Sequence, residues 1–186
     1  RDQPRSRGLG DVYKRQNADY AAKHWEILTA WSNYLAEAGM DPENQLCTED
    51  FAGHLAHNAN LSAKAIMAIA GYGRLAEMLN KPEEAKKFTE MAKRMAIEWE
   101  RRADDGDHYR LAFDMPGTWS QKYNFVWDKV LGLNILPDRI MKKEVAFYLK
   151  NQNKYGLPLD NRFTWGKTDD TVWSATCLLY TSDAAD

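Results

Sequence analysis

The sequence has few cysteines, no long apolar run and little net charge, and each of these shortages excludes a class of protein. Two cysteines in 186 residues cannot build a disulfide framework, and no paired Cys and His spacing typical of structural zinc occurs. No apolar run approaches the about 20 residues of a membrane-spanning helix. A net charge of -2 supplies no basic field for nucleic acid or an anionic membrane. We therefore expect neither a nucleic-acid nor a membrane partner.

Sequence motifs of the common catalytic and cofactor-binding classes are missing as well. The chain has no G-x-S-x-G elbow, no S-x-x-K pair, no phosphate-binding P-loop and no dinucleotide-binding glycine pattern. His54 and His57 are three residues apart, but no Glu follows His54 as in zinc proteases, which favours a structural role. We expect no metal and no cofactor. If the protein is a hydrolase, its nucleophile is then a water molecule activated by a carboxylate.

Aromatic residues are the abundant component. Seven tryptophans and nine tyrosines stand among 44% apolar residues, which is enough apolar mass for the core of one domain. Trp31, Trp99 and Tyr148 lie on predicted amphipathic faces and are expected in the core. Trp119 and Trp165 lie in predicted loops, where there is little core to fill, and they are the first indication of a binding site.

Both ends of the chain resemble non-native sequence. Arg1–Gln16 has neither helical nor strand periodicity nor the apolar region of a signal peptide, and its SRGLGDVYKRQ looks like translated transposon adapter from sequencing libraries. Cys177–Asp186 (CLLYTSDAAD) looks like the same adapter read from the other side. We therefore expect Asn17–Thr176 to be the native part, a fragment that lacks the N- and C-terminal parts of its own chain. Without the five basic and four acidic flank residues its net charge is -3, and Cys47 is its one cysteine.

The native part predicts an all-α fold in which outer and buried helices alternate. His54–Leu79 is rich in Ala and Gly with apolar residues on most sides, as in a buried helix. Pro82–Ala103 has one apolar stripe and a charged opposite face, as in a helix that covers a core. Tyr109–Phe113 alternates as in a short extended piece. The other helices are expected over Asp19–Ala38 and residues 121–133, from Pro137 onward and from Thr168 onward.

Three long loops separate these helices, over residues 39–53, 104–120 and 153–167. Loops of this length are uncommon in a compact helical domain unless they carry a function. In an antiparallel array of helices, every long loop falls at the same end and leads into the N-terminus of a buried helix. The alternation therefore predicts a toroid of α-hairpins with inner and outer helices. Roughly three hairpins are present, about half of a closed (α/α)6 toroid.

Carboxylates and aromatic side chains gather in the three loops. Such a site suits a small polar, uncharged substrate, because aromatic faces stack the ligand and two carboxylates supply a general acid and a general base. The same carboxylates also have structural explanations. Asp50 and Thr168 are placed as helix N-caps, and Asp169 and Asp170 lie where a helix dipole favours anions. The pattern alone leaves both interpretations open.

Three ordered segments resemble the central domain of the glutaminase A family. They are NQLCTEDFAGHLAHNANLSAKAI, DHYRLAFDMPGTWSQKYNFVWDKVLGL and YGLPLDNRFTWGKTDDTVWSA, and the resemblance covers nearly all of Asn17–Thr176. It implies a six-hairpin, glycosidase-like toroid in a secreted or periplasmic protein. It also implies hydrolysis of L-glutamine to L-glutamate and ammonia. The resemblance identifies the three loops as signature segments but does not identify the base.

Our hypothesis assigns the acid/base pair to Asp50 and Asp170, with Glu49 and Asp169 as supports. Arg162 and Lys122 would hold a substrate carboxylate. The remaining predicted substrate-binding residues are Trp119, Tyr123, Asn124, Asp128, Asp160, Trp165 and Lys167.

Two other functions remain open from the sequence. A carbohydrate-active enzyme on the same toroid would use a carboxyl pair about 5 Å or about 6.5–9.5 Å apart, and the tryptophans suit such an enzyme slightly better than a small amino-acid substrate. A non-catalytic helical scaffold is the third alternative. Half of a toroid exposes the apolar sides of Ala59–Tyr72, so we expect the isolated chain to be poorly soluble and inactive.

Overall fold

The computed structural model describes residues 17–43 and 53–179. Its helices, in chain order, are α2 (Asp19–Lys23), α3 (Trp25–Ala38), α4 (Ala59–Met78), α5 (Pro82–Ala103), the 3₁₀ turn η2 (Tyr123–Phe125), α6 (Val126–Val130), α7 (Asp138–Lys150) and α8 (Thr168–Leu179). Within those two ranges no strand forms, and the β-bridges are isolated pairs. The prediction of an all-α fold is confirmed.

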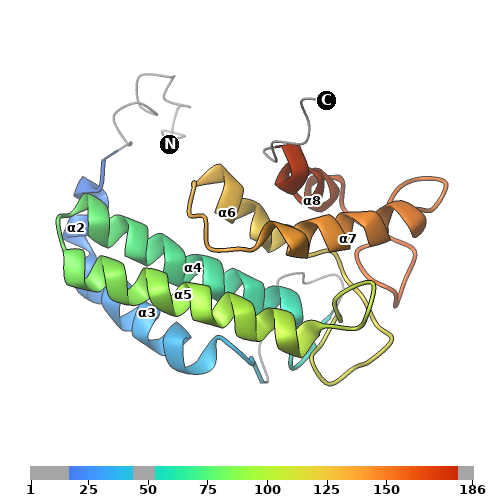
Figure 1. Ribbon diagram of the computed structural model, residues 1–186, viewed down its shortest axis with the longest axis horizontal. Helices are drawn as coiled ribbons and strands as arrows, with labels where there is room; N and C mark the ends of the chain where they lie inside the picture. Colours follow the sequence, from blue (N-terminus) through green and yellow to red (C-terminus); the bar gives the residue numbers. More distant parts are fainter. Residues whose placement is uncertain (1–16, 44–52, 180–186) are drawn as a thin grey trace, which may run out of the picture.

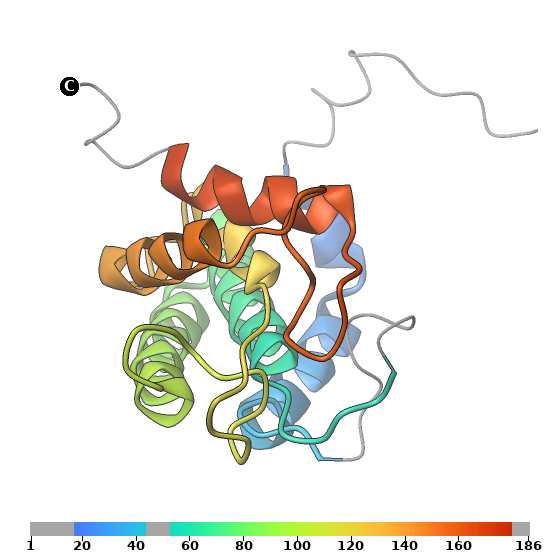
Figure 2. The ribbon, with the colours of Figure 1, turned by 90° about the vertical axis from the view of Figure 1, so that its right-hand side faces the viewer.

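The helices follow one another as three successive pairs of an outer and an inner helix. The pairs are α3 with α4, α5 with η2 and α6, and α7 with α8. A short link joins α4 to α5 at the left of Figure 1, and another joins α6 to the left-hand end of α7, whereas residues 104–122 and 151–167 lie at the right. We call these two segments the second loop and the third loop. Figure 2 faces this loop end, with both loops in front of the helices.

Inner helix α4 is buried because small residues let its neighbours approach closely. Ala59, Ala63 and Ala76 are completely inaccessible to solvent. A Cβ added to Gly73 would lie 2.8 Å from the Thr89 hydroxyl of α5, so glycine sets the distance between these two helices. The predicted character of this helix is therefore confirmed.

The core lies between α4, α5 and η2, and its largest member is Trp99. The indole of Trp99 is fully buried, and its Nε1 donates a hydrogen bond to the carbonyl of Ala59, 2.8 Å away. Its ring meets Phe125 edge to face, with centroids 4.7 Å apart. Trp99 and Tyr148 are buried as expected, but Trp31 is 59% exposed, so its assignment to the core was wrong.

The start of α4 differs from its prediction. The helix begins at Ala59 rather than His54, and the Asn58 side chain caps it by accepting from the backbone N–H of Leu61 at 2.8 Å. His57 has a left-handed φ of 59°, which no helix can continue. Its carbonyl accepts from the N–H of Phe113, 2.9 Å away, so a contact with the second loop replaces the expected helical turns.

Two other predicted elements are also changed. The helix expected over residues 121–133 consists of η2 and α6 and ends at Val130, because Gly132 and Asn134 follow with positive φ. Tyr109–Phe113 forms no strand and contributes isolated bridges to Asp104 and Asn58. By contrast, α5 has the predicted bounds, and α8 begins at Thr168 as expected.

The described helices include none that is both long and apolar enough to cross a membrane.

Candidate functional site

The second and third loops are joined side by side through their backbones. The N–H of Gln121 donates to the carbonyl of Leu159 (2.8 Å), and the N–H of Asn161 donates to the carbonyl of Trp119 (3.2 Å). The Asn161 side chain in turn accepts from the N–H of Trp119 at 3.0 Å. The two predicted signature segments therefore form one continuous surface at the loop end.

Gln121 connects this junction to α8, and nothing in the sequence distinguished it. Its buried amide nitrogen donates to the carbonyl of Pro158 (2.9 Å) and to the hydroxyl of Thr171 (3.3 Å). Its amide oxygen accepts from the hydroxyl of Ser174, 3.3 Å away. A glutamine in a predicted loop is ordinarily solvent-exposed, so its burial follows from tertiary packing alone.

Lys122 lies inside the protein and not on the site surface. Its side chain is 0% exposed, and the ammonium donates to the carbonyls of Tyr109 (3.1 Å) and Ser120 (2.8 Å). The carboxylate of Glu144 lies 3.5 Å from it. Burial lowers the pKa of Lys122, opposed by the charge of Glu144. A substrate-binding role was expected for Lys122. Its ammonium is instead enclosed by the protein, where a substrate carboxylate has no access to it.

Glu144 of α7 organises this buried cluster, and sequence analysis missed it. One carboxylate oxygen accepts from the backbone N–H of Tyr109 at 2.8 Å, and the other accepts from the hydroxyl of Tyr148. The Tyr148 oxygen also accepts from the N–H of Lys122 at 2.8 Å. Burial raises the pKa of Tyr148 well above its ordinary value, and Glu144 raises it further. The cluster of Lys122, Glu144 and Tyr148 thus attaches the second loop to an outer helix.

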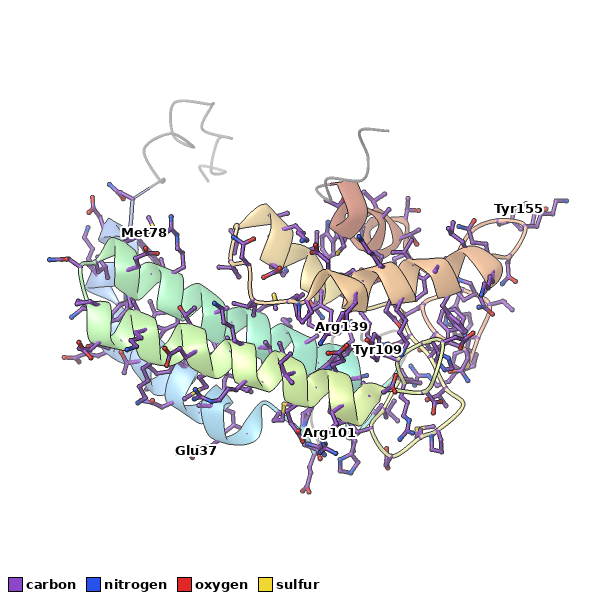
Figure 3. The ribbon with its side chains drawn as sticks, in the orientation of Figure 1. Glu37, Met78, Arg101, Tyr109, Arg139 and Tyr155 are labelled. Carbon is purple, nitrogen blue, oxygen red and sulfur yellow. The ribbon has the colours of Figure 1, made fainter. Side chains whose placement is uncertain are left out.

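A more exposed set of contacts ties α5 to α7 beside this cluster. The guanidinium of Arg139 donates to Glu100 through Nε at 2.8 Å and Nη2 at 2.6 Å. The Tyr109 hydroxyl donates to the same carboxylate at 3.2 Å, and Figure 3 shows Arg139 and Tyr109 close together between the helices. Burial and the Glu100 charge raise the pKa of Tyr109.

Arg162 is paired inside the third loop. Its guanidinium donates to the carboxylate of Asp160 at 2.6 and 3.1 Å, and its backbone N–H donates to the same carboxylate at 2.8 Å. Asp160 is 3% exposed. The pair shapes the turn, so Arg162 could bind a substrate carboxylate only by sharing its guanidinium with Asp160.

Asn124 and Asp128 join structural elements below the surface. The Asn124 amide donates to the carbonyl of Asn60 at 3.1 Å, which connects η2 to α4. Asp128 accepts from the backbone N–H of Ile135 at 2.9 Å and so fixes the link between α6 and α7. Burial raises the pKa of Asp128. This link lies at the end of α7 opposite the second and third loops (Figure 1). The predicted substrate-binding surface is at the loop end, so the contact of Asp128 with the link lies away from it.

The predicted residues that do reach the surface belong mainly to the third loop and α8. Trp165 is 52% exposed and stacks on Phe163 with ring centroids 4.5 Å apart. Lys167 and Asp169 are exposed, whereas the next carboxylate, Asp170, is 1% exposed. Of the two adjacent aspartates, the supporting one therefore faces solvent and the predicted acid/base residue is enclosed.

A polar pocket of about 450 Å³ lies where the third loop leads into α8. Lys154 and Lys167 contribute the cations of its lining. Tyr155, at the tip of the loop, is 91% exposed and points away from the body of the protein in Figure 3. The remaining lining residues are Asn153, Gly156, Leu157, Thr164, Gly166, Thr168 and Thr171. This size lies in the usual range for a small-molecule site.

A row of aromatic rings runs between the inner elements. Tyr123 of η2 lies 6.0 Å from Trp173 of α8, and Trp173 lies 6.2 Å from Trp127 of α6, centroid to centroid. Tyr123 is buried, and the two tryptophans are more than a third exposed. Trp119 is half-buried and packs edge to face against Phe147 of α7, so it covers that helix.

The first loop can be described only at its two ends. Glu49 and Asp50, half of the predicted catalytic set, lie outside the described residues. At the described ends, Asp41 bridges His57 and Arg102, with 2.8 Å between its carboxylate and the His57 Nδ1. The hydrogen bond that the Asp41 carboxylate accepts from His57 raises the pKa of His57. Burial alone would raise the pKa of Asp41. The hydrogen bonds that its carboxylate accepts from His57 and Arg102 outweigh this effect, so the pKa is lowered.

No group of three or more His, Cys, Asp or Glu side chains that could hold a metal ion occurs among residues 17–43 and 53–179. The groups that the loop end does offer are exposed carboxylate, lysine and aromatic side chains beside a polar pocket. These groups can bind a small polar ligand and move a proton to or from it.

Comparison with known proteins places this arrangement in a family. The model of the Glutaminase A six helical-hairpin domain matches residues 10–185. Glutaminase A from Aspergillus oryzae is 33% identical over 171 residues, which cover 90% of this chain and 25% of that protein. A probable glutaminase from Arthroderma benhamiae is 28% identical over 191 residues, which cover 87% of this chain and 22% of that protein.

The chain therefore spans about a quarter of the length of these curated relatives. With the match over nearly all of its residues, and with three consecutive pairs of an outer and an inner helix, the chain belongs to the glutaminase A six helical-hairpin domain family.

Proposed function

We propose that the longer protein containing this domain hydrolyses the side-chain amide of glutamine or a glutamine-like compound. The observation that carries the proposal is the polar pocket at the start of α8, which lies in a predicted signature segment of a glutaminase A-like chain. Its 450 Å³ suits a molecule of amino-acid size. Lys154 and Lys167 supply cations for a carboxylate, and the N-terminus of α8 adds backbone N–H groups that favour an anion.

The reaction consists of the attack of water on the amide carbon. A carboxylate takes a proton from the water, and a protonated acid gives one to the departing nitrogen, which leaves as ammonia when the C–N bond breaks. We propose that Asp169 contacts the substrate and that Asp170 supports it, because Asp169 is exposed and Asp170 is enclosed. Asp50 of the first loop stays the proposed partner carboxylate.

A second candidate is a carbohydrate-active hydrolase. The aromatic row of Tyr123, Trp173 and Trp127 supports it, since two of these rings offer exposed faces on which a sugar could stack. The exposed rings of Phe163 and Trp165 add to the apolar surface at the loop end.

The test uses the full-length parent protein and two assays run in parallel. Ammonia release from L-glutamine supports the first function, sugar release from a panel of glycans supports the second, and neither product means a non-catalytic module. Asp169→Asn is expected to lower kcat on the active substrate about 100-fold or more, which is the usual contribution of a general acid or base. Glu90→Gln, at an exposed position of α5, is the matched control. Full activity of Asp169→Asn would remove this residue from the proposed role.

A further inference from the structure

Gln121 lies behind the polar pocket at the start of α8, where its amide group joins the two walls of that pocket. One wall is the part of the third loop around Leu157, and the other is the first turn of α8, which ends at Thr171. The Gln121 amide nitrogen donates to the Leu157 carbonyl and to the Thr171 hydroxyl, each 3.3 Å away. It also donates to the carbonyl of Pro158 at 2.9 Å. Leu157 and Thr171 both line the pocket, so its width depends on this amide group.

The contacts of Gln121 with α8 continue to Lys167, one of the two lysines that line the pocket. The Thr171 hydroxyl that accepts from Gln121 donates to the carbonyl of Lys167, 3.1 Å away. The Gln121 oxygen accepts from the hydroxyl of Ser174, further along α8, at 3.3 Å. The nitrogen and the oxygen of the amide group thus both bind α8. The side chain thereby fixes the start of the helix, next to which Lys167 lies.

The loop wall carries the other lysine and is held together by its own backbone. Lys154 lies in a tight turn that two hydrogen bonds between the backbones of Asn153 and Gly156 close, at 2.9 and 3.1 Å. The segment after this turn folds against the end of the third loop, because the N–H of Leu159 donates to the carbonyl of Trp165 at 3.0 Å. What remains to be fixed is the position of this wall relative to α8.

We propose that Gln121 is a positioning residue that sets the distance between the two lysines that bind the substrate carboxylate. The inference rests on the proposed function, in which Lys154 and Lys167 supply these cations. Gln121 is fully buried, so it does not touch the substrate and acts through the two walls. A displaced wall separates the cations and weakens binding, whereas Asp169 keeps its place two residues after Lys167. The effect therefore falls on KM more than on kcat.

Kinetics of the full-length parent separate this role from a merely structural one. Gln121→Met keeps the approximate shape of the side chain and removes its hydrogen bonds, so it should raise the KM for L-glutamine about tenfold and change kcat less than threefold. Asn58→Ala, which removes the cap of α4, is the control that lowers the melting temperature at an unchanged KM. A folding defect alone reduces the active fraction, and with it the apparent kcat, but not the KM. That result for Gln121→Met would overturn the proposal.

A second variant tests the same contacts from Ser174, which is buried and is not one of the residues that line the pocket. Ser174→Ala removes the bond to the Gln121 oxygen and should raise the KM about threefold. The double variant with Gln121→Met should have the KM of Gln121→Met alone, because the serine acts through the amide group. An unchanged KM for Ser174→Ala, or increases that multiply in the double variant, would overturn the proposal. Ser174→Ala stays informative if Gln121→Met does not fold.

Amide hydrogen exchange of the full-length parent checks the two walls without any assay of activity. Gln121→Met should speed exchange about tenfold in peptides from residues 157–166 and from the start of α8, and Asn58→Ala should not. Unchanged exchange in these peptides of Gln121→Met would overturn the proposal. A parent that releases no ammonia would instead remove the proposed function. The exchange comparison alone would then decide whether Gln121 holds the two walls together, so the two failures are distinguishable.

Discussion

Two ionic clusters attach loops to outer helices in this protein, and they differ in burial. Lys122 and Glu144 are both 0% exposed, so their charges interact in a medium that water does not screen. Asp41 bridges His57 and Arg102, and these three side chains are 28–31% exposed. The buried cluster must be complete, because each lost partner leaves a charge without compensation. In this partly exposed cluster, water can replace a missing partner.

Removal of the buried carboxylate should have the largest effect on stability. Glu144→Gln keeps the shape of the side chain but leaves the ammonium of Lys122 without a counter-charge, which costs about 3–5 kcal/mol of unfolding free energy. Urea unfolding measures this loss, and Glu90→Gln on the exposed face of α5 is the control. The double variant Lys122→Met, Glu144→Gln should recover part of the loss. A loss below about 1 kcal/mol for Glu144→Gln would contradict the asymmetry between the clusters.

The partly exposed cluster of Asp41, His57 and Arg102 should tolerate the corresponding change better. Asp41→Asn keeps one acceptor for the His57 imidazole and removes the charge that Arg102 pairs with. We expect a loss of about 1 kcal/mol in the same urea experiment, since solvent compensates part of each lost bond. A loss equal to that of Glu144→Gln would show that burial is not what separates the two clusters.

The same cluster makes stability depend on pH. The pKa of His57 is raised in the folded protein, so the protonated ring stabilises fully below its ordinary value of 6.5. This contribution is lost as the pH rises through the folded pKa. The lowered pKa of Asp41 has the opposite sign, and its contribution is present above 3.8 and lost as the pH falls through the folded pKa. His57→Gln should flatten the unfolding free energy measured from pH 6 to 9. An unchanged slope of unfolding free energy against pH would exclude His57 as the source of the pH dependence.

A fully solvated ion pair should have the smallest effect. Arg101 donates to Glu98 at 2.6 and 2.8 Å on the outer face of α5, and both side chains are strongly exposed. Arg101→Gln should leave the melting temperature unchanged within the error of a calorimetric scan. A clear decrease in melting temperature would mean that the geometry of an ion pair contributes more to stability than its burial does.

The sequence predicted those elements whose signals are local. Pro82 and two glutamates in the first turn mark the start of α5, and one apolar stripe continues to its end at Ala103. The start of α4 was wrong because a contact with Phe113, far along the chain, sets the backbone of His57. Trp31 was assigned to the core because its helical position is apolar. Its 59% exposure shows that a helical pattern identifies an apolar face and not what covers that face.

The same distinction applies to the candidate site. Composition and resemblance identified the loops, and the structure joins the second loop to the third through Gln121 and Asn161. Charge type alone could not separate Lys122 from Lys167, since the burial of Lys122 depends on Glu144, a residue 22 positions later on another element. No local pattern carries that information. Whether Asp169 or Asp170 faces outward is likewise set by how α8 is rotated against its neighbours.

Lys122 is enclosed and supports the loops, whereas we propose that the exposed Lys167 belongs to the binding surface. The most direct test measures the melting temperature and the KM for L-glutamine of the full-length parent with Lys122→Met and with Lys167→Met. We predict that Lys122→Met lowers the melting temperature by several degrees and leaves the KM of the folded enzyme unchanged. Lys167→Met should raise the KM about tenfold at an unchanged melting temperature. A raised KM with full stability for Lys122→Met would contradict this division of roles between the two lysines.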